Sequence, residues 1–279
     1  MWRGSSLRAD AWRPVLAVAA TLVFLTQAHA NAGSQNNSES GCKKIYLTFD
    51  TGHMEIAPLV AEVLNRQNVK VTFFAANEAT KKGDGSLGDD WSPWWKARAR
   101  EGHEFASHTW NHDYWRRDIE GRPVRFQIKP SAGSDSGRSL NWSAAEYCES
   151  IARAANRLTS ITGKKALPLF RAPGGKTSPA LLAAAERCGF KHVGWSPAGF
   201  LGDELPSDRY PNEALLKQAL ASVRPGDILL AHLGIWSRQD PWAPVVLEPL
   251  IVGLKEKGFC FATLRQHPDF KGWIAAHGG

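Results

Sequence analysis

The chain has 279 residues and a formal net charge of +7 at pH 7, with 34 Lys and Arg against 27 Asp and Glu. This basic excess suits an anionic cell-wall polymer or simply a soluble surface. Because no dense Lys and Arg stripe with interleaved aromatic residues occurs, the composition argues against a nucleic-acid partner.

The first thirty residues have the features of a secretory signal peptide. Three arginines precede an apolar run from Val15 to Leu25, and the small-x-small sequence at residues 28–30 provides a cleavage site. The run is short for a membrane span, so we predict a cleaved signal at residues 1–30 rather than an anchor. Residues 31–41 predict a disordered leader, and residues 42–279 predict one domain, secreted or periplasmic.

The domain opens with a strand, a helix and a second strand. Lys44–Asp50 is rich in β-branched and aromatic residues, Ile56–Gln67 carries its apolar residues on one helical face, and Val69–Ala76 is apolar enough to be buried on both faces. This order predicts a parallel sheet. We expect an exposed loop at residues 78–90.

A short helix at Trp94–Glu101 and a strand at His103–Ser107 come next, and this strand leads directly to His108. Residues 116–140 are polar and rich in Gly, Pro and Ser, which predicts a long loop.

Regular alternation of helices and strands resumes at Ser143, where a capping box with Glu146 opens a helix. We count about seven strand and helix alternations, which predict a single α/β domain, a distorted (β/α)7-type barrel. The later helices are expected from Ser178, at Asn212–Val223 and at Val245–Lys257, and the later strands at Leu167–Arg171, His192–Trp195, Gly226–Ala231 and Phe259–Leu264.

Two histidines four residues apart, His108 and His112, have the spacing of a metal site. If a helical turn starts here, both imidazoles lie on one face and hold one divalent ion. Such a pair also occurs by chance on many surfaces, so other residues must support the interpretation.

Asp50, His108, Arg171 and His232 all fall at the carboxyl ends of expected strands, where barrel folds place their chemistry. Together they suit metal-assisted hydrolysis of an amide or ester, with Asp50 as the base and His232 as the acid. Arg171 can pair with an acid and hold it ionised.

The same residues resemble the polysaccharide deacetylases of the NodB-homology type, carbohydrate esterase family four. The resemblance extends from about Lys44 to Leu264. The matching motifs are Thr48-Phe49-Asp50-Thr51-Gly52, His108-Thr109-Trp110-Asn111-His112, Arg171-Ala172-Pro173-Gly174-Gly175 and Leu230-Ala231-His232.

The resemblance implies a distorted (β/α) barrel, a divalent metal and removal of N-linked or O-linked acetyl groups from a polymer. It implies that Asp50 is the base, that His108 and His112 are metal ligands, that Arg171 tethers the base and that His232 is the acid. We expect zinc, because imidazole suits this ion.

The chain departs from the family pattern at two places. The second aspartate of the first motif, a metal ligand in the family, is Thr51 here, and a hydroxyl is a poorer ligand than a carboxylate. His53 is one candidate for the vacant position. The fourth motif is blurred, and Asp203 is expected either to pair with Arg171 or to lie on a surface loop.

We therefore predict an exported, metal-dependent deacetylase of peptidoglycan or of an N-acetylglucosamine polymer. Two alternatives remain, a sugar-binding protein without turnover and an O-acetyl esterase. Flat apolar faces suit sugar rings, and the expected substrate contacts are Trp110, Pro173, Gly174 and Trp236. We expect a monomer.

Four cysteines in an exported chain predict two disulfides. We expect Cys42 to pair with Cys260, because the first and last strands are neighbours when a barrel closes. Cys148 and Cys188 are expected to join adjacent outer helices.

Overall fold

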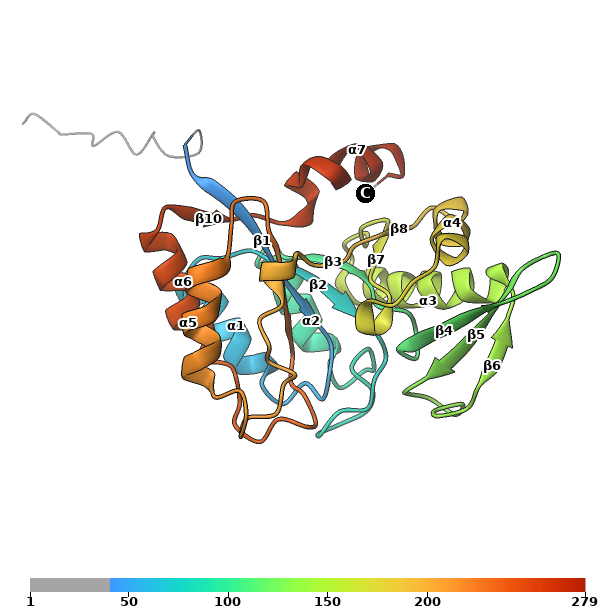
Figure 1. Ribbon diagram of the computed structural model, residues 1–279, viewed down its shortest axis with the longest axis horizontal. Helices are drawn as coiled ribbons and strands as arrows, with labels where there is room; N and C mark the ends of the chain where they lie inside the picture. The colour runs from blue at the N-terminus through green and yellow to red at the C-terminus, as the bar shows by residue number, and fades with distance from the viewer. Residues whose placement is uncertain (1–40, 279) are drawn as a thin grey trace, which may run out of the picture. The chain divides into compact units, whose positions relative to one another are not determined.

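The computed structural model describes residues 41–278. This part of the chain forms one compact unit, in which a parallel sheet is flanked by helices and a small antiparallel sheet adjoins (Figure 1). The predicted signal peptide, and the predicted leader apart from Gly41, lie outside the described residues.

Seven strands form the main sheet, and every ladder between them is parallel. They are β1 (Lys43–Asp50), β2 (Thr72–Ala75), β3 (Glu104–Ser107), β7 (Leu169–Phe170), β8 (Lys191–His192), β9 (Ile228–His232) and β10 (Phe259–Phe261).

The strand order is β10-β1-β2-β3-β7-β8, and β9 pairs with β1. Strand β1 has three neighbours, because its first residues pair with β10 and its later residues pair with β2 and with β9. In the described residues no ladder joins β8 to β9, and only a single bridge between Phe200 and Leu230 extends the sheet beside β9. The predicted distorted barrel is confirmed as a curled sheet that is not closed by a continuous ladder.

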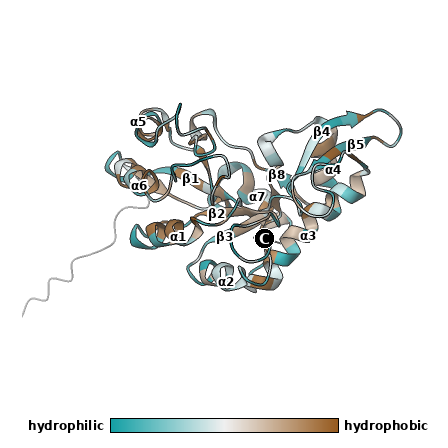
Figure 2. Ribbon diagram, turned by 90° about the horizontal axis from the view of Figure 1, so that it is seen from below, coloured by the Kyte–Doolittle hydropathy of each residue, from teal (hydrophilic) through white to brown (hydrophobic). Residues whose placement is uncertain are grey.

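Helices flank this sheet, with their apolar residues turned inward (Figure 2). Helix α3 has the predicted capping box of Ser143 and Glu146 and ends at Gly163, whose φ of 69° favours glycine. None of the described helices is both long and apolar enough to cross a membrane. The helices are α1 (Ala57–Arg66), α2 (Ser92–Arg100), α3 (Ala144–Thr162), α4 (Pro179–Arg187), α5 (Asn212–Ser222), α6 (Leu247–Glu256) and α7 (Pro268–Ala276), of which α7 was not predicted.

Aromatic residues from β1, β2 and β3 form the centre of the core. Phe73 packs between Phe49 and Phe105, and the Trp95 ring of α2 contacts the Phe73 ring in a T-shaped, edge-to-face arrangement. Because all four rings are buried, burial of their apolar area contributes roughly 1.5–3 kcal/mol per side chain. This packing fixes the strands whose ends carry the polar residues described below.

The prediction of one long loop at residues 116–140 is wrong, because strands cover residues 116–119, 125–130 and 140 of this segment. Phe126 and Ile128 are buried against Tyr147 of α3, whereas Arg125 and Lys129 face solvent. This alternation covers only a few residues among many charges, so the period of two was missed. The antiparallel sheet consists of β4 (Asp113–Ile119), β5 (Arg125–Pro130) and β6 (Leu140–Trp142).

Both predicted disulfides are confirmed. Cys42 bonds to Cys260, next to the register pair of Lys44 and Cys260 in the β1 and β10 ladder. Cys148 of α3 bonds to Cys188 at the end of α4. The first disulfide therefore ties the first strand to the last one, and the second ties two neighbouring outer helices.

Candidate active site

Four predicted residues meet at the carboxyl edge of the parallel sheet. Asp50 and His232 are the last residues of β1 and β9 and are direct partners in that ladder. His108 and Arg171 directly follow β3 and β7. Parallel strands end at one edge, so residues far apart in the sequence are brought together there.

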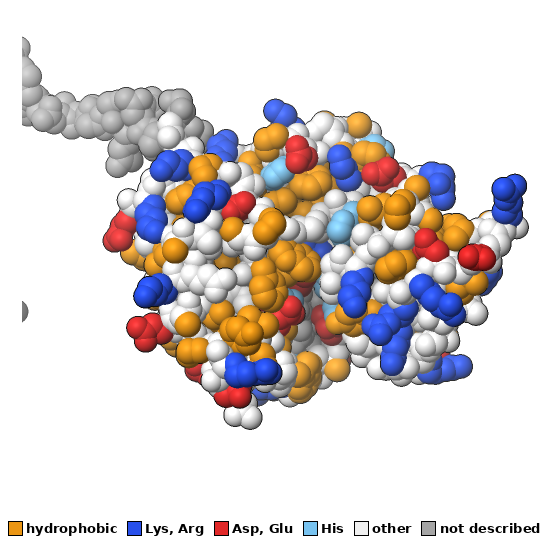
Figure 3. Space-filling model, viewed as in Figure 1, with side chains coloured by type: hydrophobic (Ala, Val, Ile, Leu, Met, Phe, Trp, Pro, Cys, Tyr) orange, Lys and Arg blue, Asp and Glu red, His pale blue; other side chains and the backbone are white. Residues whose placement is uncertain are grey.

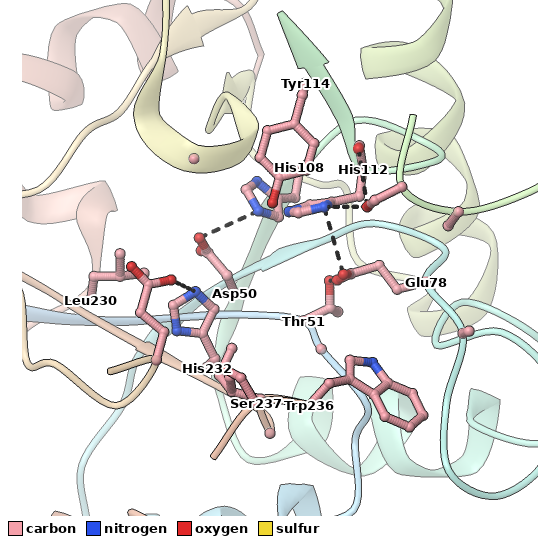
Figure 4. A pocket seen from close by; sticks show the side chains of 18 of the residues that line it. Asp50, Thr51, Glu78, His108, His112, Tyr114, Leu230, His232, Trp236 and Ser237 are labelled. Atoms are coloured by element: carbon pink, nitrogen blue, oxygen red, sulfur yellow. Dashed lines mark hydrogen bonds and ion pairs between the residues drawn. The ribbon is translucent and has the colours of Figure 1, made fainter. Parts of the chain in front are cut away.

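A cleft of about 460 Å³ opens at this edge. Acidic and histidine side chains lie together near the hollow in the space-filling view (Figure 3). Within the cleft, Asp50 lies between His108 and His232 (Figure 4). The ionisable residues that line the cleft are Asp50, Glu78, His108, His112, Tyr114, Glu204 and His232.

The helical turn expected at His108 and His112 is wrong, yet the two imidazoles still lie together. Thr109 and His112 have left-handed φ angles of 64° and 51°, which turn the chain back towards β4 without a helix. Asp113 N donates to Thr109 Oγ1 at 2.7 Å and fixes this turn. The ring centroids of the two histidines are 4.7 Å apart. Left-handed non-glycine residues of this kind are uncommon and cluster at functional sites.

His108 is held in one tautomer by the backbone. Its Nδ1 donates to the carbonyl oxygen of Arg171 at 2.9 Å, because a carbonyl can only accept. Burial lowers the pKa of His108 to about 4, so the ring is neutral at pH 7. The lone pair of Nε2 faces Asp50 Oδ2 at 3.4 Å. Two hydrogen-bond acceptors, His108 Nε2 and Asp50 Oδ2, therefore face each other, and a cation bound near them would stabilise this arrangement.

Asp50 is kept ionised by a buried guanidinium. Arg171 Nη1 donates to Asp50 Oδ1 at 2.7 Å, and both side chains are almost fully buried. Burial alone would raise the pKa of Asp50, but the Arg171 guanidinium, together with the protonated His232, outweighs burial and lowers the pKa. The second oxygen, Oδ2, remains directed at the cleft.

Asp203 pairs with His232 and not with Arg171, which corrects the sequence-based expectation. Each guanidinium nitrogen of Arg171 already has another acceptor, because Nη1 donates to Asp50 and the other two donate to the carbonyls of Val193 and Gly194. Asp203 instead accepts from both Nδ1 and the backbone N of His232, at 3.0 and 2.6 Å.

This pairing keeps a proton on His232. Burial alone would lower the pKa of His232, but Asp203 outweighs burial and, with Asp50 and Glu204, raises the pKa to about 9. One cleft thus contains an ionised carboxylate and a protonated imidazole at neutral pH.

Comparison with known proteins agrees with this geometry. The family model described as polysaccharide deacetylase matches residues 37–193, more than half of the chain. The chain belongs to the polysaccharide deacetylase family. The resemblance inferred from the motifs is therefore confirmed, and with it the prediction of a hydrolase.

Relatives of this deacetylase include enzymes with different named substrates. A chitooligosaccharide deacetylase of Azorhizobium caulinodans is 28% identical over 230 residues, covering 79% of this chain and 92% of the relative. A peptidoglycan-N-acetylglucosamine deacetylase of Bacillus cereus is 26% identical over 233 residues, covering 82% and 90%. These names do not favour the alternative of a sugar-binding protein without turnover.

The fold of the deacetylase is also found among solved structures. A family 4 acetyl xylan esterase from Clostridium thermocellum, in complex with a cobalt ion, has a TM-score of 0.62 and 24% identity. The alignment covers 82% of this chain and 92% of the esterase. At this identity the likeness establishes the shared fold.

Two of the four predicted substrate contacts lie at the cleft. Trp236 and Gly174 line it, and the Trp236 side chain is 62% exposed. Trp110 does not line it, because its ring packs under the Arg153 guanidinium at 4.1 Å. Pro173 is buried and does not line it either.

The cleft of the deacetylase contains two acids that sequence reasoning missed. Glu78 follows β2 and faces Thr51 and His112, whereas Glu204 Oε2 lies 3.9 Å from His232 Nε2. Burial raises the pKa of Glu204, against the opposing effect of His232. Glu78 lies three residues after the end of β2, in a segment expected to be an exposed loop, so the strand-end position that identified Asp50 did not identify it.

His53 is not brought into the cleft. Its Nδ1 accepts from Glu55 N at 3.1 Å, and its ring packs edge-on against Trp236. The ring lines a smaller cavity behind the cleft. The structure thus gives no support to His53 as a ligand.

The donors in the cleft fit a divalent metal. His108 offers an unprotonated Nε2, and His112 lies beside it with Nδ1 2.7 Å from Ser131 Oγ. Neutral imidazoles with a nearby carboxylate are typical zinc donors. Among residues 41–278, no group of three His, Cys, Asp or Glu side chains is already arranged to hold an ion. Binding therefore requires a side-chain adjustment.

Proposed function

We propose that the chain is an exported, zinc-dependent deacetylase that removes acetyl groups from peptidoglycan or another N-acetylglucosamine polymer. The observation that carries this proposal is the pair of opposite protonation states in one cleft. Asp50 has a lowered pKa, and His232 has a pKa raised to about 9. A base and an acid are therefore ready at the same pH, as amide hydrolysis requires.

His108 and His112 would hold the metal. When bound, a divalent ion polarises the acetyl carbonyl and lowers the pKa of the attacking water towards about 7. Asp50 accepts a proton from that water, and Arg171 keeps the carboxylate ionised and oriented for this step. His232 donates its proton to the leaving nitrogen, and Asp203 holds the imidazole in the required tautomer.

The sugar would lie against Trp236 and Gly174. An exposed indole offers a flat apolar face to a sugar ring, and Trp236 stands at the edge of the cleft. The names of the Azorhizobium and Bacillus relatives support an N-acetylated glycan as the substrate class. Export is supported by the two disulfides, which persist in oxidising compartments.

Acetate release from three polymers tests the substrate class. We expect acetate from peptidoglycan or chitooligosaccharides. Acetate from acetylated xylan alone would instead establish the O-acetyl esterase alternative. Release from none of the three would favour a binding protein.

The His232→Ala variant tests the acid. An amine is a poor leaving group until it is protonated, so we expect a loss of roughly 10²–10⁴-fold on the N-acetylated glycan. The loss on an activated acetate ester should be much smaller, because its leaving group needs no proton. Equal losses on both substrates would contradict the assignment of His232 as the acid.

A further inference from the structure

Glu78 is held in a fixed position beside the two histidines. Its backbone is clamped by the fully buried Ser86, whose Oγ accepts from Glu78 N and whose N donates to Glu78 O, each at 2.9 Å. Ser86 Oγ in turn donates to Ala76 O. The residue is thus fixed relative to the end of β2, although it belongs to an irregular segment.

The carboxylate of Glu78 is oriented by Thr51. Thr51 Oγ1 donates to Glu78 Oε2 at 2.6 Å and accepts from Ala76 N at 3.1 Å. Both hydrogen-bonding functions of the hydroxyl are therefore used, and Thr51 is occupied as a positioning residue. The residue that replaces the acid of the first motif directs another acid into the cleft (Figure 4).

The second oxygen of Glu78 faces the histidine pair. Oε1 lies 3.7 Å from His112 Nδ1, and the two side chains retain 17% and 14% exposure towards the cleft. Two donor atoms on one tetrahedral zinc ion lie roughly 3.4 Å apart, since each bond is about 2.0–2.2 Å long. The observed 3.7 Å is close to this spacing, so Glu78 Oε1 and His112 Nδ1 can share an ion once Nδ1 releases Ser131 Oγ.

We propose that Glu78 is the third protein ligand of the metal and that Thr51 positions it. The inference rests on the proposed function, because it concerns the same metal site. It assigns the carboxylate ligand to Glu78, three residues after β2, in place of Thr51 and His53. Two neutral imidazoles and one carboxylate would leave the ion with a net positive charge and an open position for water.

Metal binding to the chelator-treated protein tests this inference without recourse to turnover. Zn²⁺ is titrated by calorimetry, and Co²⁺ is titrated by its visible absorption, which reports ligand type and coordination number. The variants are Glu78→Gln, Thr51→Val and His112→Ala. Glu204→Gln is the matched control, because it removes a carboxylate from the same cleft on the side of His232.

We expect Glu78→Gln to weaken zinc binding on the order of 100-fold or more and to change the cobalt spectrum. Thr51→Val should weaken binding roughly 10-fold, as expected for a residue that orients a ligand. Glu204→Gln should bind like the wild type. Glu78→Gln retains an acceptor for Thr51, so the fold should persist. If it does not fold, Glu78→Asp, which shortens the side chain, must show weakened binding.

Two outcomes would overturn the inference, and they differ in what they say of the function. If Glu78→Gln binds zinc as tightly as the wild type while His112→Ala does not, the metal site stands and Glu78 is not its ligand. If the wild type binds no more tightly than His112→Ala, the metal-dependent function fails as well, and the assignment of Glu78 fails with it.

Discussion

The ion pair between Asp50 and Arg171 combines a structural and a chemical function. Its two members are buried together, so neutralising one leaves the other charge without a partner. The same pair keeps the proposed base ionised in a cleft where burial alone would protonate it. Stability and catalysis therefore depend on the same contact.

The Asp50→Asn variant tests this coupling. We expect acetate release to fall by roughly 10²–10⁴-fold, because the amide cannot accept the proton of the attacking water. Folding stability should fall by up to about 3–5 kcal/mol, the cost of an unpaired buried charge. Binding of an N-acetylglucosamine oligomer should change little, since no cavity is created. Rate assays, calorimetry and urea unfolding measure the three quantities, and wild-type turnover would refute the assignment of Asp50 as the base.

The pair of His232 and Asp203 predicts a specific dependence of stability on pH. The folded-state pKa of His232, about 9, lies above the ordinary value of 6.5. The pair therefore contributes stability that is complete below pH 6.5 and is lost as the pH rises through about 9.

Urea unfolding of the metal-free protein at pH 6.5 and 9.5 measures this contribution. The wild type should lose up to about 3 kcal/mol more than Asp203→Asn over this interval. Parallel pH profiles for the two proteins would show that Asp203 does not hold the proton on His232.

Position after a strand was enough to predict Asp50, His108, Arg171 and His232 as neighbours. The partner of Asp203 was not predictable in this way. Pairing with Arg171 would need a guanidinium nitrogen without another acceptor, and Nε and Nη2 donate to backbone carbonyls. Glu78 was missed because its position depends on the buried Ser86, a contact that no local pattern indicates.

At the scale of elements, the parallel strands and their helices followed from apolar periodicity and from caps such as Ser143. The β4, β5 and β6 sheet did not, because its few buried side chains, such as Phe126 and Ile128, pack against residues of α3 and β7 that only the folded chain brings close. The turn at His112 is not the helical turn considered from the spacing, because Thr109 is left-handed and Trp110 N donates to Ser150 Oγ of α3 rather than within a helix.

The two disulfides tie elements at different separations, 218 and 40 residues. Replacing either pair with serine should cost about 2–5 kcal/mol. In the chain-entropy model the Cys42 and Cys260 pair closes the longer loop, so its removal should cost roughly 1.5 kcal/mol more. Equilibrium urea unfolding of the two double variants gives the comparison. A larger loss on removing the shorter loop would show that chain entropy is not the dominant contribution.

At the scale of the whole molecule, the domain places an open cleft at the carboxyl edge of its sheet, and Tyr114 of β4 lines this cleft. Strands β4 and β5 also carry the exposed basic residues Arg116, Arg117 and Lys129. This arrangement suits a long polymer that crosses the surface while one acetylated sugar enters the cleft. A monomer, as predicted from the sequence, is sufficient for this mode of action, because every proposed catalytic group belongs to one chain.

The central claim is that acetyl removal depends on a metal held by His108 and His112. Acetate release from an N-acetylglucosamine oligomer should be lost when the protein is treated with a chelator and should return in proportion to added zinc. Reconstitution should reach its maximum at one ion per chain, and His112→Ala should not recover. Full acetate release by the chelator-treated protein, or equal recovery by His112→Ala, would contradict the account.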